Sequence, residues 1–197
     1  RKNLNTVIAP VYWELIEPQE GKFDFSLVDS MIYGARKQNL HLVILWFGSW
    51  KNGYSMYVPG WVKNDTKRFT RVKNKKGEPF VVLSALGEAS MKADAKAFKM
   101  LMQHIRQVDE KYQTVITAQI ENEAGLFYEP RDYSEQAVKA YEQGVPADLI
   151  QYLVTNKGKL QPELDSAWKA NGYKTSGSWE DVFGKSVLDK ENWKALS

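Results

Sequence analysis

Two neighbouring polar residues, Asn122 and Glu123, combine an amide and a carboxyl group, which together suit chemistry on a sugar. They lie in the stretch Gln-Ile-Glu-Asn-Glu-Ala-Gly at residues 119–125, directly after the β-prone run at 112–118. The amide can hydrogen-bond a hydroxyl group, and the carboxyl group can give or take a proton. One such carboxyl group is half of the equipment needed to hydrolyse a glycosidic bond.

The alternation of side chains along a strand places Gln119, Glu121 and Glu123 on one side of the predicted strand. Asn122 can join them only if the backbone kinks at this point. Glu121 is a candidate neighbour that favours the protonated form of Glu123, but a structural role for Glu121 is the favoured interpretation.

The composition is that of a globular domain with a hydrophobic core, because 43% of the 197 residues are hydrophobic and 26% are charged. The net charge of +3 and the lack of a basic helix argue against a nucleic-acid partner. No apolar run approaches the ~20 residues that span a bilayer, so we expect no membrane partner. The chain has no cysteine, which excludes disulfides, thiol catalysis and thiolate metal sites. His41 and His104 have no second ligand at suitable spacing, so we expect no metal.

The elements that position the polar stretch follow from hydrophobic periodicity. Three β-prone runs, at residues 6–13, 41–47 and 112–118, are joined by helical patterns and predict a parallel α/β sheet with right-handed crossovers. Pro10 cannot donate a backbone hydrogen bond, so we expect a distorted strand end there. Ser26 and Asp29 are spaced as an approximate capping box for the first helix.

Between the second and third runs we expect a long loop over residues 48–90 and a helix over 91–111. Beyond Gly125 the character of the sequence changes. Pro146 and Pro162 each begin a predicted helix, and a cap follows at residues 178–181. No strand is predicted in this part of the chain.

Three blocks of the sequence resemble the β-galactosidases of glycoside hydrolase families 35 and 42, which belong to clan A. The first block covers residues 12–18 and 21–26, the second is Val-Pro-Gly-Trp-Val at 58–62, and the third is the stretch at 119–125. The third block is close to the family 35 pattern, in which Tyr replaces Ala124. Residues 132–184 resemble an insertion carried by a bacterial branch related to family 35.

This resemblance implies a (β/α)8 barrel and a retaining mechanism, with Glu123 as general acid and base at the end of the fourth strand. Residues 1–130 would then supply strands two to four of a partial TIM barrel, and residues 131–197 a helical insertion. In the family the nucleophile is a Glu at the end of the seventh strand, which lies outside this chain. We therefore expect the chain to be a fragment that is inactive without the remainder of its own barrel.

The resemblance also implies further residues that contact the sugar. Asn122 is expected to bind the 2-hydroxyl group, Glu14 can reach the sugar from its strand end, and Trp50 and Trp61 are expected to line the site. Glu17 is interpreted as a buried structural carboxylate rather than a sugar contact.

The expected function is that of an exo-β-galactosidase acting on terminal β-galactosides of oligosaccharides or polysaccharides, with no cofactor. Where family 35 enzymes carry Ala-Glu-Trp after strand three, this chain has Gly-Ser-Trp at residues 48–50. An endo-acting mannanase or glucanase of the same clan and a non-catalytic carbohydrate-binding barrel are the alternatives. The resemblance favours a periplasmic or extracellular address, although a cysteine-free chain suits cytosol and periplasm alike.

Overall fold

The computed structural model describes residues 3–127 and 129–185. They fall into two compact units, Arg1–Phe127 and Tyr128–Ser197. The first unit is mixed α/β and the second is helical. The interpretation of these units as a part of a barrel and its insertion stays a prediction.

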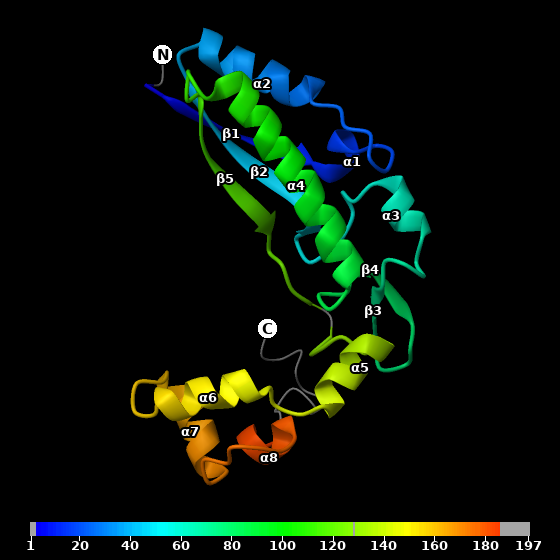
Figure 1. Ribbon diagram of the computed structural model, residues 1–197, viewed down its shortest axis with the longest axis vertical. Coiled ribbons are helices and arrows are strands. Elements are labelled where there is room, and N and C mark those ends of the chain that lie inside the picture. Colours follow the sequence, from blue (N-terminus) through cyan, green and yellow to red (C-terminus); the bar gives the residue numbers. More distant parts are fainter. Residues whose placement is uncertain (1–2, 128, 186–197) are drawn as a thin grey trace. The chain divides into compact units, whose positions relative to one another are not determined.

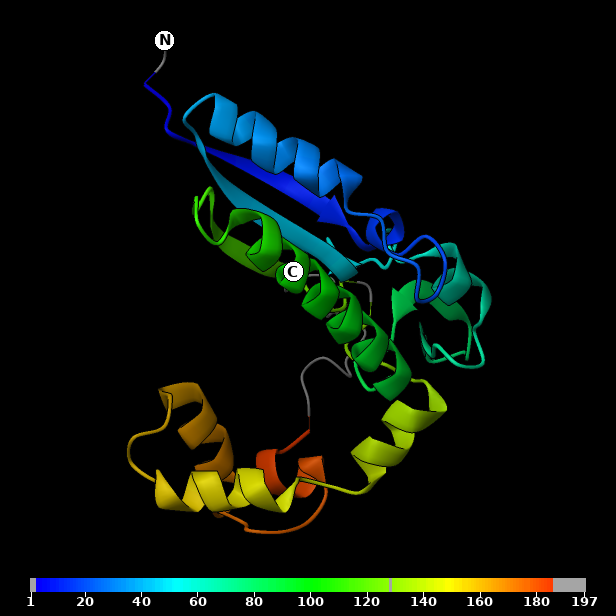
Figure 2. The same cartoon turned by 45° about the horizontal axis from the view of Figure 1, so that its top comes forward.

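A parallel sheet of three strands forms the centre of the first unit (Figure 1). The strands are β1 (Thr6–Tyr12), β2 (His41–Lys51) and β5 (Val115–Asn122), in the order β1-β2-β5. Two helices, α2 (Ser26–Lys37) and α4 (Glu88–Asp109), connect them and lie on the same face of the sheet (Figures 1 and 2). The predicted parallel α/β arrangement is confirmed, and the sheet of the described residues is open rather than closed into a barrel.

The core of this unit lies between the sheet and the two helices. Alternate side chains of β2 are fully buried against them, which follows from the period of two along a strand. The main members of the core are Leu42, Ile44 and Trp46 of β2, Val28 and Ile32 of α2, and Ala97 and Leu101 of α4. On the opposite face, Val43 and Leu45 are only half-buried and Ile8 is 65% exposed. In the part of the chain that the structure describes, β2 is therefore covered by helices on one face only.

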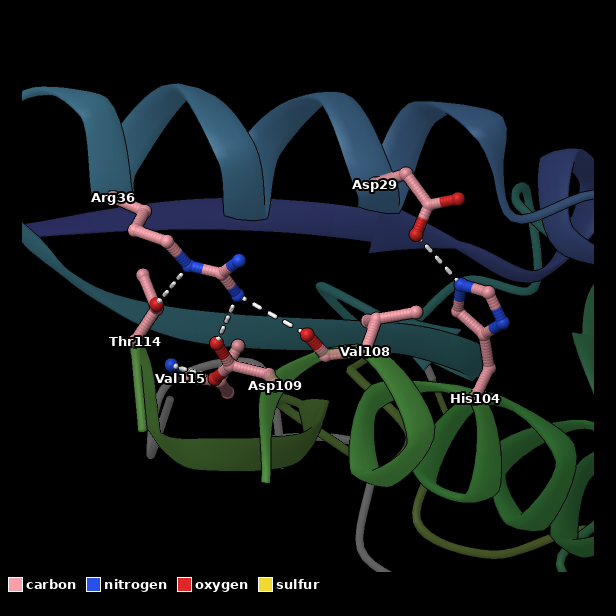
Figure 3. Close-up of polar contacts among 7 residues, drawn as sticks. All are labelled: Asp29, Arg36, His104, Val108, Asp109, Thr114 and Val115. Carbon is pink, nitrogen blue, oxygen red and sulfur yellow. Dashed lines mark hydrogen bonds and ion pairs between the residues drawn. The ribbon is translucent and has the colours of Figure 1, made fainter. Parts of the chain in front are cut away.

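Arg36 ties the end of α2 to the start of β5 (Figure 3). Its Nη2 donates to Asp109 Oδ1 at 2.7 Å, and its Nε donates to Thr114 Oγ1 at 3.2 Å. The other carboxylate oxygen of Asp109 accepts the Val115 N–H at 2.7 Å. Burial alone would raise the pKa of Asp109, but the hydrogen bonds from Val115, Thr114 and Arg36 outweigh it and lower the pKa. The ionised carboxylate therefore joins α2, α4 and β5 at the amino end of the sheet.

The predicted capping box at the start of α2 is wrong. The Ser26 N–H donates to Asp24 Oδ1 at 2.9 Å, so the carboxylate that caps this end lies before the helix. Asp29 instead lies 2.7 Å from His104 Nε2 on α4 (Figure 3). Phe25 stacks on the His104 ring at 4.3 Å between centroids. A tertiary contact between helices thus takes the carboxylate that the local pattern assigned to the cap.

The expected distortion at Pro10 is also absent, because β1 pairs with β2 in unbroken register from Thr6 to Tyr12. The His41 N–H donates to the Asn5 carbonyl at 2.8 Å, so odd-numbered residues of β1 face β2. Pro10 then points its nitrogen to the edge that no described strand covers, so no hydrogen bond of the β1–β2 ladder is lost.

Residues 48–90 are more ordered than the predicted loop. β2 extends to Lys51, and α3 (Gly60–Asn64) and an antiparallel hairpin of β3 (Arg71–Lys73) and β4 (Pro79–Leu83) follow. β1 ends at Tyr12, and the short helix α1 (Trp13–Ile16) follows directly.

The second unit consists of α5 (Glu135–Glu142), α6 (Ala147–Thr155), α7 (Pro162–Ala170) and α8 (Trp179–Phe183). The helices predicted after Pro146 and Pro162 and the cap at Ser178 are confirmed, and α5 is an addition. The small core of the second unit consists of Ile150, Leu153, Trp168 and Val182. Residues 129–185 contain no strand, as predicted. Within the described ranges, no helix combines the length and apolar character needed to cross a bilayer.

Candidate active site

The carboxyl end of β5 leaves regular strand geometry at Glu121. Glu121 has φ of 60° and Glu123 has φ of 51°, a left-handed region that few residues other than glycine adopt. The kink brings Asn122 to Gln119, whose Nε2 donates to Asn122 Oδ1 at 3.1 Å and to the Glu121 carbonyl at 2.9 Å. The kink that Asn122 needs in order to reach Gln119 is therefore present.

A two-residue turn at the end of β2 holds this kinked tip. Lys51 and Tyr54 exchange both backbone hydrogen bonds, at 2.8 and 3.1 Å, around Asn52 and Gly53. Both turn residues have positive φ, 53° and 69°, as in the type I′ turns that Asn-Gly pairs favour. Their N–H groups point at β5, where Asn52 donates to the Asn122 carbonyl and Gly53 to the carbonyl of the following residue, each at 3.0 Å.

The carboxyl group of Glu121 faces the backbone of β2. It accepts the Ser49 N–H at 2.9 Å and the Trp50 N–H at 2.6 Å. Asp94 of α4 reaches the same place, where its Oδ2 accepts the Ser49 N–H at 2.7 Å and the Ser49 hydroxyl at 2.6 Å. The other oxygen of Asp94 accepts Trp46 Nε1–H at 2.8 Å. These contacts agree with the structural role predicted for Glu121.

The neighbouring carboxyl group of Asp94 changes the protonation of Glu121. Burial raises the pKa of Glu121, and the hydrogen bond and the charge of Asp94 raise it further, to about 9. The backbone donors of Trp50 and Ser49 act in the opposite direction but do not cancel this effect. At neutral pH Glu121 is therefore protonated and can share its proton with Asp94.

The surroundings of this pair are largely apolar on one side and closely packed where β2 passes. A cavity of about 410 Å³ adjoins it, lined largely by apolar groups that include Leu83, Phe98 and Ile120. Gly48 passes so close that a Cβ there would lie 2.5 Å from Asp94 Oδ1 and 2.5 Å from Trp46 Nε1. Glycine is therefore required where β2 crosses the carboxyl pair.

An aromatic group lies at the carboxyl ends of β1 and β2. Tyr57 has its ring centroid 4.5 Å from that of Tyr12 and 6.0 Å from that of Phe47. Lys51 Nζ lies 5.3 Å from the Phe47 ring centroid, and Lys51 pairs in register with Asn122. Aromatic rings next to polar groups suit the binding of a sugar, whose C–H faces are apolar and whose hydroxyls are not.

The residues predicted to contact the sugar lie in different surroundings. Asn122 lies in the kinked tip, and Trp50 is joined to the tip by its N–H, which donates to Glu121 Oε2. The Trp50 side chain donates to the Leu83 carbonyl at 3.1 Å. The Glu14 carboxylate pairs with Lys63 Nζ at 2.8 Å. The Glu14 N–H donates to the Tyr57 carbonyl, which places Glu14 beside the aromatic group. Glu123 is exposed, and its side chain makes no hydrogen bond within the described residues.

Trp61 lies apart from the tip, against α1. Its Nε1 donates to the Glu17 carbonyl at 3.0 Å, and its ring packs edge-on against those of Trp13 and Phe69. Glu17 is 1% exposed, and its carboxylate accepts Trp13 Nε1–H at 3.0 Å and the Gly21 N–H at 2.8 Å. The interpretation of Glu17 as a buried structural carboxylate is confirmed.

Asn52, Gly53 and Asp94 are not among the residues singled out from the sequence. The Asn-Gly dipeptide is a strong local signal for a two-residue turn and could have identified the first two. Asp94 lies in a helix and carries no local signal, because its partners come from β2 and β5.

Comparison with known proteins extends this description. A family model described as β-galactosidase, glycoside hydrolase family 42, matches residues 1–184. The chain belongs to glycoside hydrolase family 42. The match covers the first unit and continues through the helices of the second, as far as residue 184. No curated protein sequence matches the chain.

Solved structures of β-galactosidases share this fold at low sequence identity. The β-galactosidase of the Antarctic haloarchaeon Halorubrum lacusprofundi matches with a TM-score of 0.55 and 18% identity, over 95% of this chain and 26% of that one. The β-galactosidase of Bacillus circulans sp. alkalophilus matches with a TM-score of 0.52 and 16% identity, over 93% of this chain and 25% of that one. The β-galactosidase of the psychrophilic Marinomonas ef1 matches with a TM-score of 0.52 and 15% identity, over 93% of this chain and 26% of that one. The family 42 chain thus spans about a quarter of the length of these relatives.

The site offers hydrogen-bonding and acid–base groups. Within residues 3–127 and 129–185, no group of three or more His, Asp or Glu side chains is placed to hold a metal ion. What the site can do chemically is bind hydroxyl groups through Asn122 and transfer a proton through Glu123.

Proposed function

We propose that the chain is part of the catalytic barrel of a retaining exo-β-galactosidase, in which Glu123 is the general acid and base. The observation that carries this proposal is the position of Asn122 and Glu123 at the carboxyl end of β5, in a chain that belongs to family 42. Catalytic residues of parallel β/α barrels come from the carboxyl ends of their strands. β1, β2 and β5 would be the second, third and fourth strands.

The open sheet supports a partial barrel. Ile8 and Ile116 are 65% and 52% exposed, and the outer edges of β1 and β5 have no partner strand among the described residues. Unpaired edges and exposed apolar side chains favour the addition of further strands. We infer that the remainder of the barrel covers them, and that the chain by itself has low stability and no hydrolytic activity. The relation to family 35 and the bacterial origin of the insertion stay predictions.

In the proposed reaction Glu123 acts twice. As an acid it gives its proton to the glycosidic oxygen while a nucleophilic carboxylate, supplied by the rest of the barrel, attacks the anomeric carbon and the C–O bond breaks. As a carboxylate it then takes a proton from the water that attacks the glycosyl-enzyme, which releases the sugar and restores both groups. The two carboxyl groups of a retaining site lie about 5 Å apart.

The other residues of the site would bind the substrate, a terminal β-galactoside. Asn122 would donate to the 2-hydroxyl group of the sugar. Trp50 has support as a sugar contact because its backbone is hydrogen-bonded to Glu121 in the same tip. Glu14 lies beside Tyr57, and Trp61 would reach substrate only by the part of its ring that α1 leaves exposed.

The test is hydrolysis of a panel of aryl β-glycosides by the full-length protein that contains this chain, beside its Glu123→Gln variant. We expect cleavage of the β-galactoside and a loss in the variant that is at least a hundredfold for poor leaving groups and smaller for good ones, because only poor ones need a proton. Glu110→Gln is the matched control, since Glu110 is an exposed carboxylate at the amino end of the sheet.

Three results would contradict the proposal. An equal loss for all leaving groups would show that Glu123 is not the acid. Cleavage of internal bonds in mannan or glucan would favour an endo-acting enzyme of the same clan. Binding of sugars without cleavage of any would favour a carbohydrate-binding barrel.

A further inference from the structure

The side-chain amide of Asn122 lies in a directional chain of hydrogen bonds. Gln119 Nε2 donates to the Asn122 Oδ1, and Asn122 Nδ2 donates to Asn52 Oδ1 at 2.9 Å. This series of hydrogen bonds begins at a backbone group, because Gln119 Nε2 also donates to the Glu121 carbonyl. A carbonyl only accepts, so it determines which end of the Gln119 amide faces the tip.

This series of hydrogen bonds allows only one orientation of the Asn122 amide. If that amide were flipped, its NH2 group would face the Gln119 donor and its oxygen would face the Asn52 oxygen. The contact with Gln119 would then be repulsive, and so would the contact with Asn52 as long as Asn52 Oδ1 keeps its place. In the observed orientation one Nδ2 proton and one lone pair of Oδ1 remain for a further partner.

The backbone of the same turn holds the tip as well. Asn52 N–H donates to the Asn122 carbonyl and Gly53 N–H to the Glu123 carbonyl, each at 3.0 Å. The turn itself is fixed by two positive φ values and by the Phe127 ring, which lies where a Cβ on Gly53 would be. Asn52 therefore controls both the backbone and the side chain of Asn122.

We propose that Asn52 is a positioning residue, which turns the free Nδ2 proton of Asn122 toward the 2-hydroxyl group of the sugar. The inference rests on the function proposed above. Asn52 acts through Asn122 and does not touch the sugar. It thereby determines how strongly the site distinguishes a 2-hydroxy sugar from its 2-deoxy analogue.

Two variants separate the side chain of Asn52 from its backbone. Asn52→Gly keeps the positive φ and both N–H donors of the turn but removes the amide acceptor. Asn52→Asp keeps an acceptor oxygen at the same place and tolerates the left-handed conformation. A merely structural role would affect the hydrolysis of all substrates equally in each variant.

The experiment measures kcat/KM of the full-length protein on an aryl β-galactoside and on its 2-deoxy analogue. We expect Asn52→Gly to lower the ratio of the two values roughly tenfold, the size of one hydrogen bond, while Asn52→Asp keeps it within about twofold of the unchanged protein. Equal losses on both substrates, or an unchanged ratio in Asn52→Gly, would overturn the proposal. Gln119→Glu, which removes the donor to Asn122 Oδ1, should lower the ratio in the same way and serves if Asn52→Gly fails to fold.

Binding gives the same comparison without turnover. Calorimetric affinities of the Glu123→Gln protein for galactose and 2-deoxygalactose, with and without Asn52→Gly, do not require hydrolysis. A preference for galactose that Asn52→Gly removes would support the role of Asn52 even if no glycoside is cleaved, in which case only the proposed activity fails. A preference that Asn52→Gly leaves intact would overturn the role of Asn52 whatever the activity.

Discussion

Asp94 and Glu121 converge on a single backbone donor, the Ser49 N–H, which lies 2.7 Å from Asp94 Oδ2 and 2.9 Å from Glu121 Oε1. The two residues come from α4 and β5, and the donor comes from β2. One proton between the two carboxyl groups removes their repulsion and lets both bind the backbone of β2. The residue before the Asn122–Glu123 pair is thereby joined to the neighbouring strand and to the helix behind it.

This carboxyl pair predicts that stability falls as pH rises. The pKa of Glu121 is raised from 4.5 to about 9 on folding. Between these values the folded chain holds a proton that the unfolded chain lacks, so its stabilising contribution is complete below about pH 4.5 and is lost as pH rises toward 9. For one proton the slope is at most about 1.4 kcal/mol per pH unit. Urea unfolding at several pH values between 5 and 9 measures it.

The contribution of Glu121 is isolated by comparison with variants. In Glu121→Gln the group cannot titrate, and in Asp94→Asn the second carboxyl group that raises the pKa is absent. We expect the free energy of unfolding of both variants to depend less on pH over this range than that of the unchanged chain. The same slope in all three proteins would show that no proton is shared.

Gly48→Ala should destabilise the chain by about 1 to 3 kcal/mol, the usual cost of overpacking. The new methyl group would lie 2.5 Å from both Asp94 Oδ1 and Trp46 Nε1, so their hydrogen bond must move. Thermal unfolding measures the effect. Gly34→Ala is the control, since a Cβ at this helical position meets nothing within 4 Å and should stabilise α2 by about 0.5 to 1 kcal/mol. Equal melting temperatures for the two variants would contradict this account of Gly48.

Glu17→Ala should destabilise the chain by about 2 to 4 kcal/mol, because the Trp13 Nε1–H and Gly21 N–H donors would lose a buried carboxylate. Glu20→Ala removes an exposed carboxylate paired with Arg68 and should cost less than about 1 kcal/mol. Urea unfolding compares the two. In the full-length protein, an unchanged stability together with a loss of kcat/KM in Glu17→Ala would mean that Glu17 contacts the sugar instead.

The strands and long helices could be predicted from the sequence because their hydrophobic periods are local and strong. The apolar run of β2 and the amphipathic patterns of α2 and α4 each specify an element without reference to the rest of the chain. The hairpin of β3 and β4 was not predicted, because Arg71–Lys73 is short and charged and resembles a loop until it pairs. The capping box at Ser26 failed because His104, far along the chain, takes Asp29.

The sequence by itself determined the parallel α/β unit and the polar tip with Asn122 and Glu123. It also showed that Asn122 can join the side chains on the other face of the strand only if the backbone kinks. These depend on composition, on periodicity and on a short motif, all of which are local. Only the tertiary structure decided the surroundings of that tip. Asp94 meets Glu121, and Asn52 meets Asn122 across 70 residues of sequence, because the paired strands β2 and β5 and the packed helix α4 bring their side chains together. Contacts of this kind depend on register and packing, which no local pattern of residues specifies.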